Sequence, residues 1–257
     1  MKHWITVVIL LVPVLVGAEP ILEFRNDLAF QATSVNSFAT QAYRKRLQKL
    51  SVANELDRNP ALLQRLHTLI NRLLPAAEYE RPSASKLGWE VHVCRDCYEN
   101  ASAMAGGKIL VSEDFIAQLN PSDDELGYLL AHEMGHVLAQ HTREFATTAR
   151  FFVGMGLKRD YPDIQQEIDE SFSLMIRMAP LYQEQEMGAD YIGFILGARS
   201  GFKPLAMLSL LHKLDTGSKS MLDTHPDSHR RFLHASSILP AAMRLYQQRK
   251  KEDGENK

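Results

Sequence analysis

The 257-residue sequence predicts an α+β fold that is mainly helical and contains a small β-sheet. Leucines recur at helical spacing over long stretches, most clearly within residues 62–73. Trp89, Val91 and Val93 alternate with polar residues, which is the pattern of a half-buried strand. The composition is that of a globular protein, with 45% hydrophobic residues, 23% charged residues and a formal net charge of −2. Because a strong basic excess is absent, the composition argues against a nucleic-acid-binding protein.

The N-terminal residues predict a signal peptide. Lys2 and His3 precede an apolar run at residues 5–16, which is shorter than the ~20 residues of a membrane-spanning helix. We expect residues 1–18 to be removed and residues 19–257 to form a single domain, exported to the bacterial periplasm and without an integral membrane segment. No cysteine directly follows the run, so the mature protein is not expected to be a lipoprotein. The alternative is an uncleaved membrane anchor.

The expected elements follow from the apolar spacing and from the prolines that interrupt it. Two helices are expected within residues 34–74, the second ending at Pro75, and strands are expected at residues 89–93 and 108–111. Further helices are expected after Pro121, at 164–178, at 183–199 and at 204–214. A polar loop at 215–227 should precede two short helices and a charged tail, 249–257, which we expect to fray.

Residues 132–136 read H-E-M-G-H, which is the pattern H-E-x-x-H. Residues four apart on a helix lie about 40° apart around its axis, so His132 and His136 project from one face and can share one metal ion. Glu133 lies between them and can reach a water molecule on that metal. Ser122 and Glu125 form a capping box that predicts where this helix begins. The alternative is an amphipathic helix that carries the five residues by chance.

A catalytic zinc ion normally has three protein ligands, and Glu186 is the candidate for the third. Glu186 and Asp190 are four residues apart, so their carboxylates share a helix face, and Asp190 could accept a hydrogen bond from a liganding histidine. Gly135 and Ala189 lack bulk and would allow the two helices to approach closely. The alternative is a solvated acidic helix surface.

Two further histidines need separate interpretations. If the motif helix continues, His141 projects about 180° from His132, so we expect it to face away and to have a packing role. His225 lies between Thr224 and Pro226, where a histidine held in a loop could donate a hydrogen bond to a developing oxyanion. The alternative for His225 is an incidental position at a loop-to-helix junction.

Cys94 and Cys97 are the two cysteines of the chain. In an oxidising compartment a C-x-x-C pair at this spacing is expected to form a disulfide that staples a turn. The alternatives are a redox-active pair, and a second zinc site for which His92 is the one obvious neighbouring ligand.

Three ordered motifs together resemble the gluzincin peptidase family M48, and most of all its periplasmic quality-control members of the BepA/LoiP type. The motifs are His132-Glu133-x-x-His136, Glu186-x-x-Ala189-Asp190, and Thr224-His225-Pro226 followed by Arg231. The resemblance covers about residues 34–239, and it includes residues 100–111, which are similar to the active-site edge strand of the family. One departure is Gln183, where the family often has an arginine that positions the helix.

The resemblance implies a zincin-like metallopeptidase domain whose edge strand precedes the H-E-x-x-H helix. It implies one zinc ion held by His132, His136 and Glu186, with Glu133 as the base that activates the zinc-bound water. His225 would lie near the metal, and Asp190 and Arg231 would support the ligands. The residues expected to bind an extended substrate as an added strand are Asn100, Ala101, Lys108, Ile109, Leu110 and Val111.

The expected function is therefore a zinc-dependent endopeptidase that hydrolyses unfolded or misfolded envelope proteins. The expected partners are unfolded polypeptides, with peripheral association with the envelope assembly machinery. Two alternatives stay open. One is a catalytically silent chaperone of the same fold, and the other is a thiol oxidoreductase that uses Cys94 and Cys97.

Overall fold

The computed structural model describes residues 21–25, 27–95, 97, 99–153, 159–216 and 228–255. The predicted signal peptide and the predicted loop residue His225 lie outside the described residues. The described elements, in chain order, are α1 (Ala32–Val52), α2 (Pro60–Glu80), the 3-10 helix η1 (Pro82–Lys86), β1 (Glu90–Cys94), β2 (Ala101–Met104), β3 (Lys108–Ser112), α3 (Glu113–Leu119), α4 (Asp123–Ala139), α5 (His141–Val153), α6 (Tyr161–Glu170), α7 (Phe172–Arg199), α8 (Leu205–Thr216) and α9 (Ser228–Glu255).

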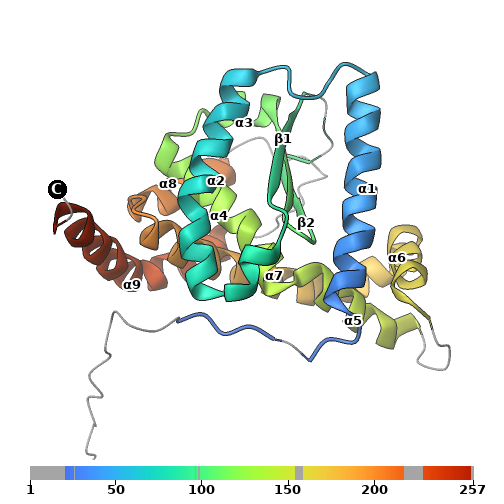
Figure 1. Cartoon of the computed structure of the whole chain (residues 1–257). Coiled ribbons are helices and arrows are strands. Elements are labelled where there is room, and N and C mark those ends of the chain that lie inside the picture. Colours follow the sequence, from blue (N-terminus) through green and yellow to red (C-terminus); the bar gives the residue numbers. More distant parts are fainter. Residues whose placement is uncertain are drawn as a thin grey trace, which may run out of the picture.

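The mainly helical fold with a small sheet is confirmed. The three strands lie in the order β1-β3-β2, with β1 parallel and β2 antiparallel to β3. A short turn joins β2 to β3, and Gly106 and Gly107 both adopt positive φ angles of 85° and 83° there. Figure 1 shows α1 and α2 standing on either side of the sheet, while α7 crosses beneath it.

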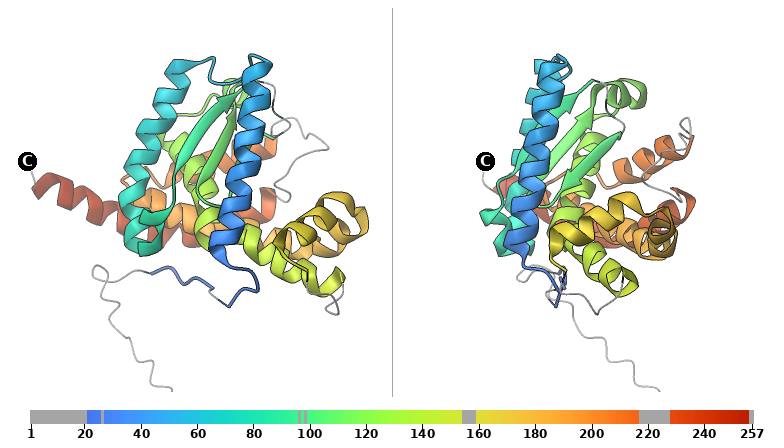
Figure 2. Two further views of the ribbon diagram at one scale, coloured as in Figure 1. Left: turned by 45° about the vertical axis from the view of Figure 1, so that its right-hand side comes forward. Right: turned by 90° about the vertical axis from the view of Figure 1, so that its right-hand side faces the viewer.

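The core of the protein is formed where α2, α4, α7, α8 and α9 pack together. Leu66, Leu126, Leu130 and Phe194 are fully buried in this core. A second, smaller apolar cluster holds α5 and α6 against the start of α7, and Tyr161 and Ile164 are among its buried residues. Figure 2 shows α5 and α6 together at one side of the molecule, beside the lower end of α1.

Three helices continue through a proline, and at Pro75 and Pro180 the sequence predicts a break. Pro75, Pro180 and Pro240 lie inside α2, α7 and α9. An internal proline removes one hydrogen bond and costs about 3 kcal/mol. Buried residues lie on both sides of each proline, so packing along the whole helix offsets this cost. The flanking pairs are Leu73 and Ala76, Met178 and Gln185, and Ile238 and Ala242.

The C-terminal region also differs from its prediction. The two short helices expected after residue 227 are one helix, α9, which includes residues 249–255 of the charged tail. An ion pair of 3.1 Å between Arg249 and Asp253, one helical turn apart, supports this last segment. Among the described residues, no helix combines the length and the apolar character that crossing a bilayer requires.

Candidate metal centre and active site

Helix α4 brings the two histidines of the motif together. The helix begins at the predicted capping box, in which the Ser122 hydroxyl accepts from the Glu125 N–H at 3.3 Å and the Glu125 carboxylate accepts from the Ser122 N–H at 2.7 Å. One turn apart near its C-terminal end, His132 and His136 direct their Nε2 atoms towards one another at 3.1 Å. His132 is buried and His136 is half-buried.

Helix α7 supplies the third side chain. Glu186 is 1% exposed, and its two carboxylate oxygens lie 3.5 Å from His132 Nε2 and 3.3 Å from His136 Nε2. The three side chains form a group that could hold a metal ion, with all donor atoms within 4.8 Å of one another. It is the one such group among the residues that the structure describes.

Small residues allow this approach of α4 and α7, as the sequence predicts. A Cβ atom added to Gly135 would lie 2.8 Å from the backbone oxygen of Ala189. On the other helix, a Cβ atom added to Gly193 would lie 2.8 Å from the backbone nitrogen of His132. Neither backbone atom can move away as the end of a flexible side chain could. The contact between the two helices therefore depends on glycine at both positions.

The donor atoms lie close enough together to share a single metal ion. With metal–ligand bonds of about 2.0–2.1 Å, two ligand atoms of a tetrahedral zinc site lie about 3.3–3.4 Å apart. The two Nε2 atoms are 3.1 Å apart, and one oxygen of Glu186 lies 3.3 Å from His136 Nε2 while the other lies 3.5 Å from His132 Nε2. Two imidazole nitrogens and one carboxylate oxygen are also a known ligand set of catalytic zinc. The residues present thus fit a divalent metal of the zinc type.

Asp190 and Arg231 hold the outer side of His132. Asp190 Oδ1 lies 2.9 Å from His132 Nδ1, and the Arg231 guanidinium donates two hydrogen bonds, of 2.7 and 2.8 Å, to the same carboxylate. Burial alone would raise the pKa of Asp190, but Arg231 and His132 hold this pKa far below its usual value. Asp190 is therefore a fixed anion at Nδ1 of His132, while Nε2 of the same ring faces the other two side chains.

The charges at the site also favour a bound cation. Glu133, Glu186 and Asp190 are each at most 1% exposed, whereas Arg231 is the one buried cation that the described residues place beside them. Three carboxylates and one guanidinium leave a net negative charge beside the histidines, which a bound cation would balance. Burial and Arg231 lower the pKa of His132, but Asp190 and Glu186 raise it, to a net value of about 9. The site thus stabilises positive charge at the ring.

His141 does not face away from the motif, so that prediction is wrong. Gln140 adopts a left-handed conformation (φ 59°, ψ 38°) that ends α4, and the next residue begins α5 in a new direction. The reversal places His141 Nδ1 2.9 Å from His136 Nδ1. Projection along a continuous helix failed because α4 ends at Ala139, before His141.

An open cleft of about 350 Å³ lies beside the three side chains. Glu133 and His136 are among its lining residues. Strand β2 forms one wall, and α5, α6 and α7 contribute the opposite wall. The residues of this opposite wall are His141, Thr142, Phe145, Gln165, Ile168, Tyr182 and Gln185.

The edge strand of the sheet is β2 rather than β3, which corrects the predicted substrate-binding residues. Lys108, Ile109, Leu110 and Val111 belong to the central strand, where every residue is buried and both sides are paired. They cannot accept an added strand. Of the predicted residues, Ala101 lines the cleft and Asn100 directly precedes β2, whereas Ser102 and Ala103 are cleft residues that the sequence reasoning missed.

The register of β2 shows which of its backbone groups point into the cleft. Asn100 O accepts from Ser112 N at 2.9 Å, so this pair is hydrogen-bonded across β2 and β3. In an antiparallel ladder hydrogen-bonded and non-hydrogen-bonded pairs alternate. Ala101 pairs with Val111 and Ala103 pairs with Ile109 as non-hydrogen-bonded pairs, so the N–H and C=O groups of both alanines face the free edge.

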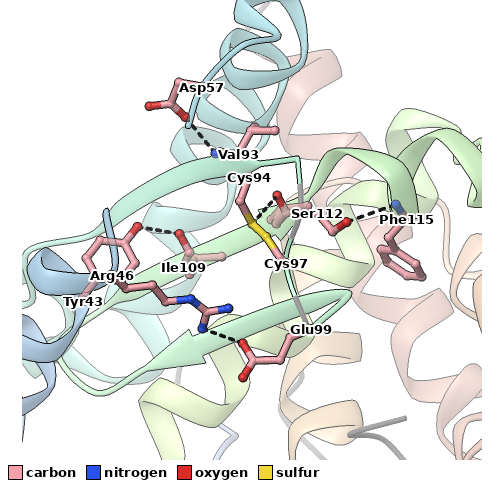
Figure 3. Close-up of a disulfide and its surroundings, with 11 residues drawn as sticks. Tyr43, Arg46, Asp57, Val93, Cys94, Cys97, Glu99, Ile109, Ser112 and Phe115 are labelled. Atoms are coloured by element: carbon pink, nitrogen blue, oxygen red, sulfur yellow. Dashed lines mark hydrogen bonds and ion pairs between the residues drawn. A yellow bond between two sulfur atoms is a disulfide. The ribbon is translucent and has the colours of Figure 1, made fainter. Parts of the chain in front are cut away.

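A disulfide joins Cys94 and Cys97, with their Cα atoms 5.9 Å apart (Figure 3). It links the end of β1 to the segment that leads into β2. In the same segment, Glu99 forms an ion pair of 2.8 Å with Arg46 of α1 and also lines the cleft. The alternative of a second zinc site here is not supported, because His92 instead contacts Asp57 at 2.5 Å and Glu90 at 3.1 Å.

Two residues of α7 near Glu186, Tyr182 and Gln183, differ from what the sequence led us to expect. Gln183, where the family often has an arginine, accepts a hydrogen bond of 3.4 Å from Arg230, so α7 is still tied to α9 at this point. Tyr182, which the sequence reasoning passed over, precedes Glu186 by four residues and so shares its helix face. That spacing was the signal that could have placed Tyr182 in the cleft.

Comparison with known proteins agrees with this site. The model of peptidase family M48 matches residues 60–239. The mitochondrial metalloendopeptidase OMA1 of Saccharomyces cerevisiae is 28% identical over 201 residues, covering 72% of this chain and 58% of the relative. The metalloprotease LoiP of Escherichia coli is 27% identical over 236 residues, covering 83% of this chain and 85% of the relative.

The beta-barrel assembly-enhancing protease of Yersinia pestis is 28% identical over 207 residues, covering 70% of this chain and 39% of the relative. The chain therefore spans about half the length of several curated relatives, including the OMA1 proteins of two yeasts. The family model, however, matches well over half of this chain, and the matched segment contains all three side chains of the candidate metal centre. The chain belongs to peptidase family M48.

Proposed function

We propose that this protein is a zinc-dependent endopeptidase that hydrolyses unfolded polypeptides. The observation that carries the proposal is the convergence of His132, His136 and Glu186, with donor atoms within 4.8 Å of one another, beside a cleft that Glu133 also lines. These three side chains would hold one zinc ion. When bound there, zinc would polarise the scissile carbonyl and lower the pKa of a water molecule towards neutrality.

The residues of the chain would carry out the proton transfers. Glu133 would accept the proton of the attacking water and return it to the leaving amine, a step that is typically worth about 10²–10⁴-fold in rate. Asp190 and Arg231 would keep His132 oriented, with its Nδ1 against Asp190 and its Nε2 directed towards the metal site. His225 remains our candidate donor to the oxyanion, on the basis of the sequence motif alone.

Substrate would bind as a strand along β2. The outward N–H and C=O groups of Ala101 and Ala103 offer main-chain hydrogen bonds that do not depend on the substrate sequence. The opposite wall, with Phe145, Ile168 and Tyr182, offers apolar contact to side chains. This combination favours extended, apolar segments, which folded proteins keep buried.

The place of action belongs to the same proposal. Two relatives carry names that connect them with proteolysis and beta-barrel assembly in bacteria. With the N-terminal signal pattern, this supports export to the periplasm, misfolded envelope proteins as substrates, and contact with the envelope assembly machinery.

We also propose that residues 19–257 act as one metallopeptidase domain. In support, α9 supplies Arg231 to the site, and the N-terminal residues Ile21 and Leu22 donate their N–H groups to Glu80 of α2.

Metal analysis and casein cleavage test the proposal together. The purified wild type should contain one zinc per chain and cleave casein, whereas Glu133→Gln should retain zinc and lose at least ~10²-fold of the cleavage rate. Equal cleavage by both proteins would overturn the role of Glu133, and lack of zinc binding would overturn the metal centre. Thiol–disulfide exchange activity that survived chelation but disappeared in Cys94→Ser would make the thiol oxidoreductase the better interpretation. Zinc binding without cleavage by the wild type would support a chaperone.

A further inference from the structure

The two histidines of the metal centre have different partners on their outer nitrogens. His132 Nδ1 faces the carboxylate of Asp190, whereas His136 Nδ1 lies 2.9 Å from Nδ1 of His141. A neutral imidazole has one protonated nitrogen, so a histidine that binds metal through Nε2 must carry its proton on Nδ1. His136 Nδ1 is then a donor, and His141 Nδ1 must be the acceptor.

The chain holds His141 in this position from two sides. The left-handed residue Gln140 turns α5 back towards α4, so the ring of His141 lies against the ring of His136 with centroids 4.9 Å apart. On the other side, the amide of Gln185 donates a hydrogen bond of 3.1 Å to the backbone oxygen of His141. Gln185 is the residue before Glu186, so His141 is tied to the helix that carries the third ligand.

We propose that His141 is a positioning residue that fixes the Nδ1–H tautomer of His136 and so directs His136 Nε2 to the metal. The proposal rests on the proposed metal centre and adds a residue that lies outside the ligand set. His141 would do for His136 what Asp190 does for His132, but with a neutral acceptor in place of a charged one.

The environment of His141 agrees with an acceptor. The side chain is 8% exposed. A neutral ring that keeps its own proton on Nε2 presents a lone pair at Nδ1. Outer hydrogen-bond partners of liganding histidines typically change metal affinity by about 10–100-fold.

Zinc affinity of three variants tests the proposal. His141→Ala removes the acceptor, whereas His141→Asn places an amide oxygen close to the position of Nδ1. Thr142→Ala, which changes the next residue along the cleft, is the matched control. In competition with a fluorescent zinc chelator, His141→Ala should bind zinc about 10–100-fold more weakly than the wild type. His141→Asn should recover most of this loss, and Thr142→Ala should bind as the wild type does.

A spectroscopic measurement separates positioning from folding. At saturating cobalt, the visible absorption of the Co²⁺ protein should change in His141→Ala and return towards the wild-type spectrum in His141→Asn. The proposal is overturned if His141→Ala binds zinc within twofold of the wild type, or if its loss is matched by metal-free unfolding and not restored in His141→Asn. Absence of zinc binding in the wild type would instead overturn the metal centre itself.

Discussion

The candidate active site has two sides that are built differently. On the side of α4 and α7, Glu133, Glu186, Asp190 and Arg231 are each at most 4% exposed, and two glycines bring the helices into backbone contact. On the side of β2, most residues of the strand are half-buried and its backbone groups face an open cleft. The α5–α6 region beyond the cleft even exposes Phe151 by 63% and Phe152 by 47%.

This difference in structure implies that the two sides of the site have different functions. A closed, charged and tightly packed side can hold a metal ion and a general base in fixed geometry. An open side with free backbone groups can accept many polypeptide sequences. Substitutions on the closed side should therefore change metal affinity and the free energy of unfolding, whereas substitutions on the open side should change KM.

The largest effect is expected from Arg231→Met on the closed side. It would leave the buried carboxylates of Asp190 and Glu186 without their cation, and breaking a buried pair in this way costs about 3–5 kcal/mol. Urea unfolding of the metal-free protein measures this loss. Arg230→Met is the matched control, because Arg230 is exposed, and its effect should stay within about 0.5 kcal/mol. Equal effects of the two variants would contradict the ionic network.

The next effect is expected from Gly135→Leu, which tests the contact between α4 and α7. The added side chain meets the backbone of Ala189 and not a flexible side chain, so we expect the upper end of the usual overpacking cost of about 1–3 kcal/mol. Zinc affinity should also fall, because Glu186 moves away from the histidines. Gly254→Leu is a suitable control, since an added Cβ atom there meets nothing within 4 Å. Unchanged zinc affinity in Gly135→Leu would refute the packing explanation.

A smaller effect is expected from removing the disulfide. For a loop of four residues, the chain-entropy relation gives about 2 kcal/mol of stabilisation. Because Cys94 and Cys97 lie on the open side, the double variant Cys94→Ser/Cys97→Ser should lose stability and raise KM for casein without changing zinc affinity. Denaturation and zinc titration of the same sample check both parts. A large loss of zinc would show that the two sides are not independent.

The parts of the site that the sequence predicted correctly depend on local spacing. The i, i+4 placement of His132 and His136 and the capping box at Ser122 both lie within one helix. The approach of Glu186 was accessible because Gly135 and Ala189 mark a close helix contact. The mainly helical fold followed from apolar periodicity for the same reason.

The errors concern properties that local spacing does not determine. Glycine and asparagine are the usual residues in the left-handed conformation at a helix end, but this turn has Gln140 there. The end of α4, and with it the position of His141, was therefore not predicted. The order of the strands is a tertiary property, although one signal was available. Ile109, Leu110 and Val111 form a continuous apolar run, which is typical of a central strand, whereas β2 reads Ala-Ser-Ala-Met. The prolines within helices were misjudged because packing outweighed the local cost.

The smallest effect is expected from Ala103→Pro on the open edge of β2. The Ala103 N–H points away from β3, so its removal leaves the sheet ladder intact and proline is tolerated on such an edge. A substrate strand would lose one main-chain hydrogen bond, worth about 1 kcal/mol, which corresponds to roughly a five- to tenfold lower kcat/KM. Ala103→Val keeps the N–H and should retain the wild-type value. Zinc affinity and the unfolding midpoint should be the same in both variants, because neither changes a metal-binding side chain or a hydrogen bond between β2 and β3. If Ala103→Pro and Ala103→Val cleaved casein equally well, the substrate would not pair with β2, and the open side would bind it through its apolar wall instead.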